Sequence, residues 1–108
     1  MIAAVFHGPG EMEAMEVDGP DIGPDEVLVK VGANTLCGTD GRILRGEKTK
    51  GVRRPSILGH EFAGHGAQVG QRVQGFEVGV PVAMAPVIPD RKCFYCKNGM
   101  ENACLNRN

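Results

Sequence analysis

The placement of the cysteines is the feature that most constrains how this chain folds. Cys93, Cys96 and Cys104 lie close together, whereas Cys37 stands far from them in the 108 residues. A local ligand cluster suits a structural metal ion, and ligands gathered from distant segments suit a catalytic ion that keeps one position open. The fold must therefore close around one cluster and also bring Cys37 to a second ligand-bearing triplet, Gly59-His60-Glu61. This contrast between two sites indicates an enzyme.

The length and the charge of the chain argue against a nucleic-acid-binding or membrane-spanning protein. A chain of 108 residues forms one small domain that buries about 60 to 65% of its unfolded surface, so a bound ion would add stability. A net charge of −1 with interspersed signs lacks the basic footprint of a nucleic-acid-binding protein. The apolar stretches are too short to span a bilayer, and residues 1–6 do not resemble a signal peptide. We therefore expect a cytoplasmic protein without nucleic-acid or membrane partners, whose four cysteines are metal ligands.

Turn-forming residues favour short strands over long helices. The chain contains 16 glycines and 7 prolines, a composition typical of many turns. Strand-like runs occur at residues 2–6, 26–33 and 82–84. Pro81 should mark a strand start or an edge, because proline lacks the N–H of a sheet ladder. The sequence therefore predicts a mainly β fold.

One short helix is expected between Cys37 and Gly46. Ile43-Leu44 forms an apolar pair flanked by polar residues, and Thr39 or Asp40 is expected to be the N-cap. Gly46 is expected to end the helix.

The chain lacks the signature of a nicotinamide-binding site. Gly8-Pro9-Gly10 and Gly64-His65-Gly66 each begin a G-x-G motif, but neither continues to a third glycine at the right spacing. Neither lies between a buried strand and a helix, as a dinucleotide-binding loop does. We therefore expect any nucleotide cofactor to be bound by another segment.

Several short motifs follow one another in a characteristic order and spacing. They are Cys37-Gly38-Thr39-Asp40, Leu58-Gly59-His60-Glu61-Phe62-Ala63-Gly64, Val69-Gly70, Phe76-Glu77-Val78-Gly79 and the cysteine segment that ends at Cys104. With these motifs the whole chain resembles the zinc-dependent medium-chain alcohol and polyol dehydrogenases. The resemblance implies a GroES-like, partly open β-barrel with short helices and a zinc-binding lobe. It also implies that residues 1–108 are a truncated GroES-like catalytic domain, with the structural zinc lobe at 86–108 and the nucleotide-binding domain absent.

The resemblance implies a catalytic zinc site at Cys37 and His60. The ion would stabilise the alkoxide form of an alcohol before hydride transfer. Glu61 would be either a further ligand in some states or a close neighbour of the metal. Asp40 would hold the free ring nitrogen of His60 and fix its tautomer. Thr39 would provide the first hydroxyl of the relay that carries the substrate proton outward.

The resemblance also implies a structural zinc site in the cysteine segment. Relatives carry four cysteines there, and Asp90 stands where the first of them would be. A carboxylate can bind zinc, so Asp90 is expected to be the fourth ligand beside Cys93, Cys96 and Cys104. The alternative is a segment that has lost its metal, in which Cys93 and Cys96 form a reactive thiol pair.

Three classes of function follow from these interpretations. The first is the zinc-binding catalytic domain of an NAD(P)-dependent dehydrogenase acting on a small-molecule alcohol, polyol or sugar. NAD(P) would bind only to the full-length, homo-oligomeric enzyme, so the fragment alone should be inactive. The second is a non-catalytic metal-binding or interaction module from a truncated paralogue. The third is a thiol redox protein that uses Cys93 and Cys96.

Overall fold

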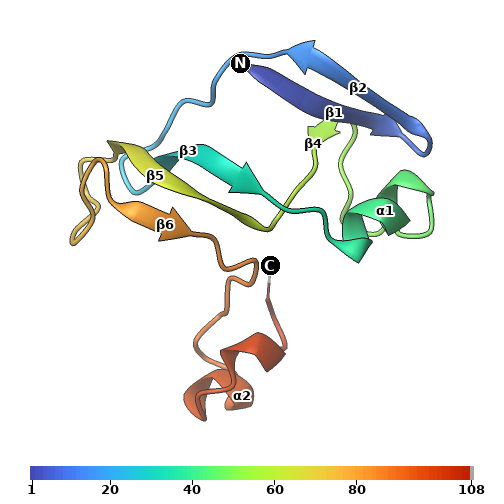
Figure 1. Cartoon of the computed structure of the whole chain (residues 1–108). Helices are drawn as coiled ribbons and strands as arrows, with labels where there is room; N and C mark the ends of the chain where they lie inside the picture. Colours follow the sequence, from blue (N-terminus) through green and yellow to red (C-terminus); the bar gives the residue numbers. More distant parts are fainter. Residues whose placement is uncertain (108) are drawn as a thin grey trace.

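The regular secondary structure consists mainly of two three-stranded antiparallel sheets (Figure 1). The structure is a computed structural model that describes residues 1–107. The first sheet has the order β2-β1-β4 and contains β1 (Ile2–Gly8), β2 (Glu11–Glu16) and β4 (Ser56–Ile57). The second has the order β3-β5-β6 and contains β3 (Val27–Asn34), β5 (Phe62–Val69) and β6 (Pro81–Ala83). The helices are α1 (Gly38–Leu44), α2 (Phe94–Lys97) and the 3-10 helix η1 (Glu101–Ala103).

The strands expected from the sequence are confirmed as β1, β3 and β6, each within two residues or so of its expected bounds. Pro81 begins β6, the edge strand of its sheet, where a missing N–H costs no ladder bond. The sequence did not predict β2, whose residues are all exposed and include three glutamates in EMEAME. It also did not predict β5, which contains the glycine-rich Gly64-His65-Gly66.

Glycine at position 64 allows β3 and β5 to approach closely. Gly64 pairs with Val31, and a Cβ added at Gly64 would lie 2.1 Å from the carbonyl oxygen of Lys30. Any side chain there would force the two strands apart. The Gly64-His65-Gly66 motif therefore belongs to a sheet, in agreement with its exclusion as a nucleotide-binding loop.

The start of α1 differs from the expected cap. The N-cap is Cys37, whose sulfur accepts a hydrogen bond from the Thr39 backbone N–H, and Asp40 at N3 bonds back to the Cys37 N–H. The expectation that Thr39 or Asp40 is the N-cap was therefore wrong, because a cysteine sulfur fills the place that a serine oxygen has in a capping box. The expected end is confirmed: the C-cap is Arg45, followed by Gly46 at φ 76°, a conformation that glycine adopts without strain.

The hydrophobic core is small and, outside the cysteine segment, consists of residues from β1 and α1. Val5 and Phe6 of β1 and Ile43 of α1 are buried, and Phe6 is only 1% exposed. A backbone hydrogen bond from Gly10 N–H to the Leu44 carbonyl (2.7 Å) also ties the β1–β2 turn to the end of α1. This bond places the end of α1 next to the first sheet.

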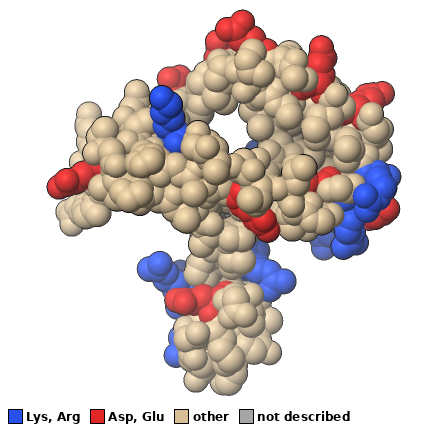
Figure 2. Space-filling view, viewed as in Figure 1, with Lys and Arg blue, Asp and Glu red and all other residues tan. Residues whose placement is uncertain are grey.

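An opening lies between the two sheets, as Figure 2 shows. A groove of about 340 Å³ between them is lined mainly by apolar side chains, among them Ile2, Val31 and Ile57. The radius of gyration is 15.8 Å, whereas a compact domain of this size has about 13 Å. The larger radius reflects both the opening between two separate sheets and a segment that projects from them, so the barrel is partly open, as the resemblance implied.

Residues 90–106, here called the cysteine lobe, project away from both sheets (Figures 1 and 2). The lobe contains α2 and η1, which pack against each other. Its buried side chain is Cys104, which is 1% exposed. Within residues 1–107, no helix has the length and apolar character needed to cross a membrane.

Two candidate metal centres

Cys37 is held at the start of α1 by two hydrogen bonds. Its backbone N–H donates to Asp40 Oδ2 (2.9 Å), and its sulfur accepts from the Thr39 N–H (3.5 Å). The Cys37-Gly38-Thr39-Asp40 motif thus begins the helix and also orients the Cys37 thiol. Thr39 lies half-buried in the first turn of α1, and it contacts this sulfur through its backbone N–H.

Asp40 stands behind His60. The Asp40 side chain is buried, and its Oδ1 atom has no hydrogen-bond partner within the described residues although it lies 3.5 Å from His60 Nδ1. An unpaired buried carboxylate oxygen is costly, so a proton on Nδ1 directed at Asp40 would relieve it. That tautomer leaves Nε2 of His60 with a free lone pair, which is the form in which a histidine binds a metal.

Gly59 makes the turn that brings His60 to Cys37. Its φ is +117°, and a Cβ there would lie 3.1 Å from Nδ2 of Asn34. The backbone conformation therefore favours glycine, and a side chain there would also have to displace the Asn34 amide by a few tenths of an ångström. The Leu58-Gly59-His60-Glu61 motif thereby turns the chain between β4 and β5 toward the beginning of α1.

Cys37, His60 and Glu61 converge into one candidate metal site. One ligand atom from each lies within 4.8 Å of the others, with Cys37 and His60 half-buried and Glu61 exposed. The three residues come from the N-cap of α1 and from the segment leading into β5. A thiolate, an imidazole and a carboxylate are the ligand types that zinc accepts, so the donor set fits this ion.

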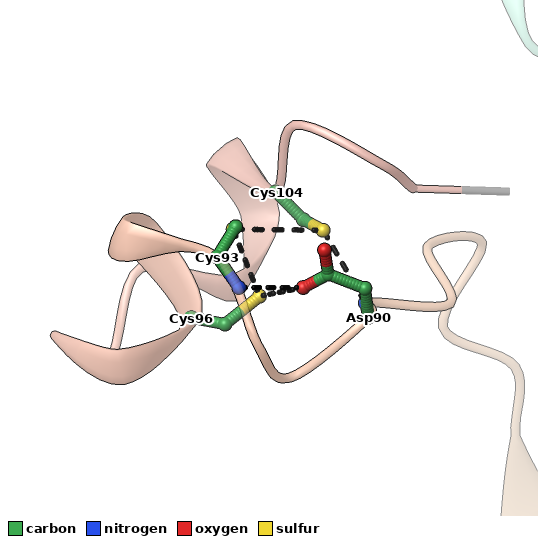
Figure 3. Close-up of side chains that lie close together, drawn as sticks. All are labelled: Asp90, Cys93, Cys96 and Cys104. Carbon is green, nitrogen blue, oxygen red and sulfur yellow. Dashed lines mark hydrogen bonds between the residues drawn. The ribbon is translucent and has the colours of Figure 1, made fainter.

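The second candidate site lies in the cysteine lobe (Figure 3). Ligand atoms of Asp90, Cys93, Cys96 and Cys104 all lie within 4.8 Å of one another. The Cys93 sulfur is 3.5 Å from that of Cys96 and 3.9 Å from that of Cys104, and all four cysteines of the chain are free. Three sulfurs and one carboxylate around a common centre fit a closed, four-coordinate zinc site.

Asp90 shapes the loop that carries Cys93. Its Oδ1 accepts hydrogen bonds from the backbone N–H groups of Lys92 (2.8 Å) and Cys93 (3.0 Å). Its Oδ2 accepts from the Asn106 side-chain amide (2.5 Å). The Cys93 and Lys92 N–H groups, and then the Asn106 amide, hold the pKa of Asp90 well below its usual range. Asp90 is therefore an anion in position to face a cation.

The thiols of the lobe have unequal acidity. The backbone N–H groups of Cys96 and Leu105 lower the pKa of the Cys93 thiol. Burial, followed by contacts with the Cys93 and Cys104 thiols, raises the pKa of Cys96 to about 12. A second thiolate beside Cys93 and the Asp90 anion is unfavourable unless a cation shares the site. The electrostatics of the lobe thus suit a bound metal ion.

Two residues of these sites were not found from the sequence. Thr35 donates its hydroxyl proton to Glu61 Oε2 (2.8 Å), and Asn106 contacts Asp90. Each pair joins residues far apart in the sequence and belongs to no motif, so only the fold places them together.

Comparisons with known proteins agree with this architecture. A family model described as the alcohol dehydrogenase GroES-like domain matches residues 23–108. The chain is 43% identical to L-threonine 3-dehydrogenase of Pyrococcus furiosus over 87% of its length and 28% of that protein. It is 42% identical to sorbitol dehydrogenase of Bacillus subtilis, over 96% of the chain and 30% of that protein.

A solved structure shares the whole arrangement of elements. Galactitol-1-phosphate dehydrogenase from Escherichia coli superposes with a TM-score of 0.87 at 31% identity, covering 100% of this chain and 31% of that one. The chain thus spans about 30% of the length of the proteins that it matches. It belongs to the family of alcohol dehydrogenase GroES-like domains that is typical of zinc-dependent dehydrogenases.

Proposed function

We propose that this chain is the zinc-binding catalytic domain of an NAD(P)-dependent alcohol or polyol dehydrogenase. The observation that carries this proposal is the convergence of Cys37, His60 and Glu61, with an unpaired oxygen of buried Asp40 directed at His60. The names of the relatives, L-threonine 3-dehydrogenase and sorbitol dehydrogenase, refer to small molecules with hydroxyl groups. We therefore propose an alcohol, polyol or sugar as the substrate.

The residues of the first site would have distinct roles in alcohol oxidation. A bound zinc ion supplies a Lewis acid, which lowers the pKa of a coordinated hydroxyl. Cys37 and His60 would be ligands, and Glu61 a further ligand. Asp40 would keep the proton of His60 on Nδ1 and would orient the ring. Thr39 follows the Cys37 ligand in the first turn of α1, and its hydroxyl would accept the proton of the substrate hydroxyl and pass its own proton on.

The cysteine lobe would hold a second, structural zinc ion. Its ligands would be Cys93, Cys96 and Cys104, with Asp90 in the fourth position, and all four come from one short segment. Metal binding to such a segment is coupled to its folding. The ion would thereby fix the lobe, which projects beyond the sheets and has few apolar contacts of its own.

The hydride acceptor would bind outside the described residues. Residues 1–107 contain no strand followed by a three-glycine loop and a helix, the unit that holds a dinucleotide pyrophosphate. We propose that NAD(P) binds to the part of the full-length enzyme that corresponds to the remaining length of the relatives.

We also propose that the enzyme is a cytoplasmic homo-oligomer. Its free cysteines suit a reducing compartment. Ile2 is 74% exposed beside the apolar opening, and β2 and β6 are free sheet edges, which are features of surfaces that pair with another chain.

Zinc content tests the two-site proposal. The full-length protein, purified with its metal, should hold two zinc ions per copy of this domain, because the two ligand sets share no residue. Cys93→Ser should remove one ion and His60→Ala the other, as measured by elemental analysis. If loss of both Cys37 and His60 leaves the zinc content unchanged from that of the wild type, the catalytic site is refuted.

A further inference from the structure

Thr35 lies directly after β3 and continues the pairing of β3 with β5. The last ladder pair is Asn34 with Phe62, and the Thr35 N–H then donates to the Glu61 carbonyl oxygen (2.9 Å). This backbone bond sets Thr35 beside Glu61 whatever the Thr35 side chain is. The two side chains therefore emerge next to each other at the edge of the first metal site.

The Thr35 hydroxyl donates to one oxygen of the Glu61 carboxylate. The distance from Thr35 Oγ1 to Glu61 Oε2 is 2.8 Å, and a longer contact of 3.4 Å joins the same hydroxyl to the Glu61 carbonyl oxygen. Glu61 is exposed, so without this bond its side chain would be free to sample several rotamers. Oε2 accepts the hydroxyl proton, whereas no hydrogen bond within residues 1–107 reaches Oε1, which keeps all of its lone pairs for a cation.

We propose that Thr35 is a positioning residue for the Cys37, His60 and Glu61 site, and that its hydroxyl holds Glu61 so that a single oxygen is presented to the metal. The inference rests on the proposed zinc site. Carboxylates that bind metals are themselves held by hydrogen bonds, and loss of such a partner typically weakens metal binding about 10–100-fold. Thr35 would act in this way on Glu61, as Asp40 does on His60.

Two substitutions at this position separate the hydroxyl from the rest of the side chain. Thr35→Val keeps the branched shape and the backbone bond to Glu61 but removes the hydroxyl. Thr35→Ser keeps the hydroxyl. In the full-length protein, Thr35→Val should weaken zinc binding at the first site about 10–100-fold, whereas Thr35→Ser should bind as the wild type does. Competition with a chelator measures the zinc affinity. The titration has one step for each site, and the step that is missing in His60→Ala belongs to the first site.

A second pair of measurements shows whether Thr35 acts through Glu61. In a Glu61→Ala background, Thr35→Val should cause no further loss of affinity, because the carboxylate that it positions is gone. With Co²⁺ in the site, the d–d absorption of Thr35→Val should shift toward that of Glu61→Ala, and Thr35→Ser should keep the wild-type spectrum. The affinity of the cysteine lobe should be the same in all variants.

The outcomes separate this inference from the proposed function. If the wild type binds no metal that depends on His60, the zinc site itself is wrong. If the site binds zinc and Thr35→Val matches the wild type in affinity and spectrum, the role of Thr35 is refuted. An equal loss of affinity with and without Glu61 also refutes it, because Thr35 would then support only the backbone.

Discussion

Replacing His60 with alanine should reduce alcohol oxidation by the full-length enzyme about a thousandfold. The physical reason is the loss of a ligand that holds the Lewis acid at the substrate hydroxyl. A metal ion in this role stabilises the transition state by several kcal/mol, and about 4 kcal/mol corresponds to a thousandfold change in rate. The rate constant kcat and the zinc content should fall together, and steady-state kinetics with elemental analysis measures both.

His65→Ala is a matched control for this substitution. His65 is a histidine only five positions from His60 in the sequence. It is exposed within β5, where it pairs with Lys30 and Pro81. Its replacement should leave both the rate and the zinc content close to wild-type values. If His60→Ala retains normal turnover while His65→Ala does not, the assignment of the first site is wrong.

The second large effect is expected at Asp90 and concerns stability. Asn in place of Asp90 keeps one oxygen that can accept from the Lys92 and Cys93 N–H groups. Asp90→Asn therefore removes the negative charge and the oxygen that accepts from the Asn106 amide. The lobe should then bind zinc about 100-fold more weakly, at the upper end of the losses seen for supporting residues. At fixed free zinc, a hundredfold loss lowers the free energy of unfolding by about 2.7 kcal/mol.

Asp90→Cys should have the opposite effect. A fourth thiolate gives zinc a softer tetrahedral set, so affinity and melting temperature should rise above those of the wild type. Chelator titration and thermal melting of the three proteins measure zinc affinity and melting temperature. Both should be highest with Cys at position 90, lower with Asp and lowest with Asn. Asp21→Asn, at an exposed loop aspartate, controls for the loss of one surface charge. Unchanged zinc affinity and melting temperature in Asp90→Asn would show that Asp90 is not a ligand.

The ligand sets could be proposed from the sequence because each lies in a short motif. The local geometry follows from the motifs themselves. A capping box forms within Cys37-Gly38-Thr39-Asp40, and a glycine turn forms within Gly59-His60-Glu61. The proposed ligands accordingly converge in two groups. The N-cap of α1 was assigned wrongly because Cys37 serves two purposes, as a candidate metal ligand and as the cap.

Other features depended on tertiary structure and left no local signal. Strand β2 buries none of its six residues, and it is defined by its pairing with β1. The contact of Thr35 with Glu61 depends on the register of β3 against β5 across 26 residues of sequence. A one-residue change in that register would direct the side chains to opposite faces, so the contact follows only from the folded sheet.

Zinc X-ray absorption of one variant tests the central claim most directly. With Cys93, Cys96 and Cys104 all replaced by serine, Cys37 is the single cysteine of the 4 in this domain that remains. The lobe projects away from the sheets, so the first site should keep its geometry. The expected zinc environment has one sulfur at about 2.3 Å and nitrogen or oxygen ligands at about 2.0–2.2 Å, and the sulfur signal should vanish when Cys37 is also replaced. A bound zinc ion with no sulfur neighbour, or a variant that binds no zinc although it is folded, would contradict the catalytic site at Cys37 and His60.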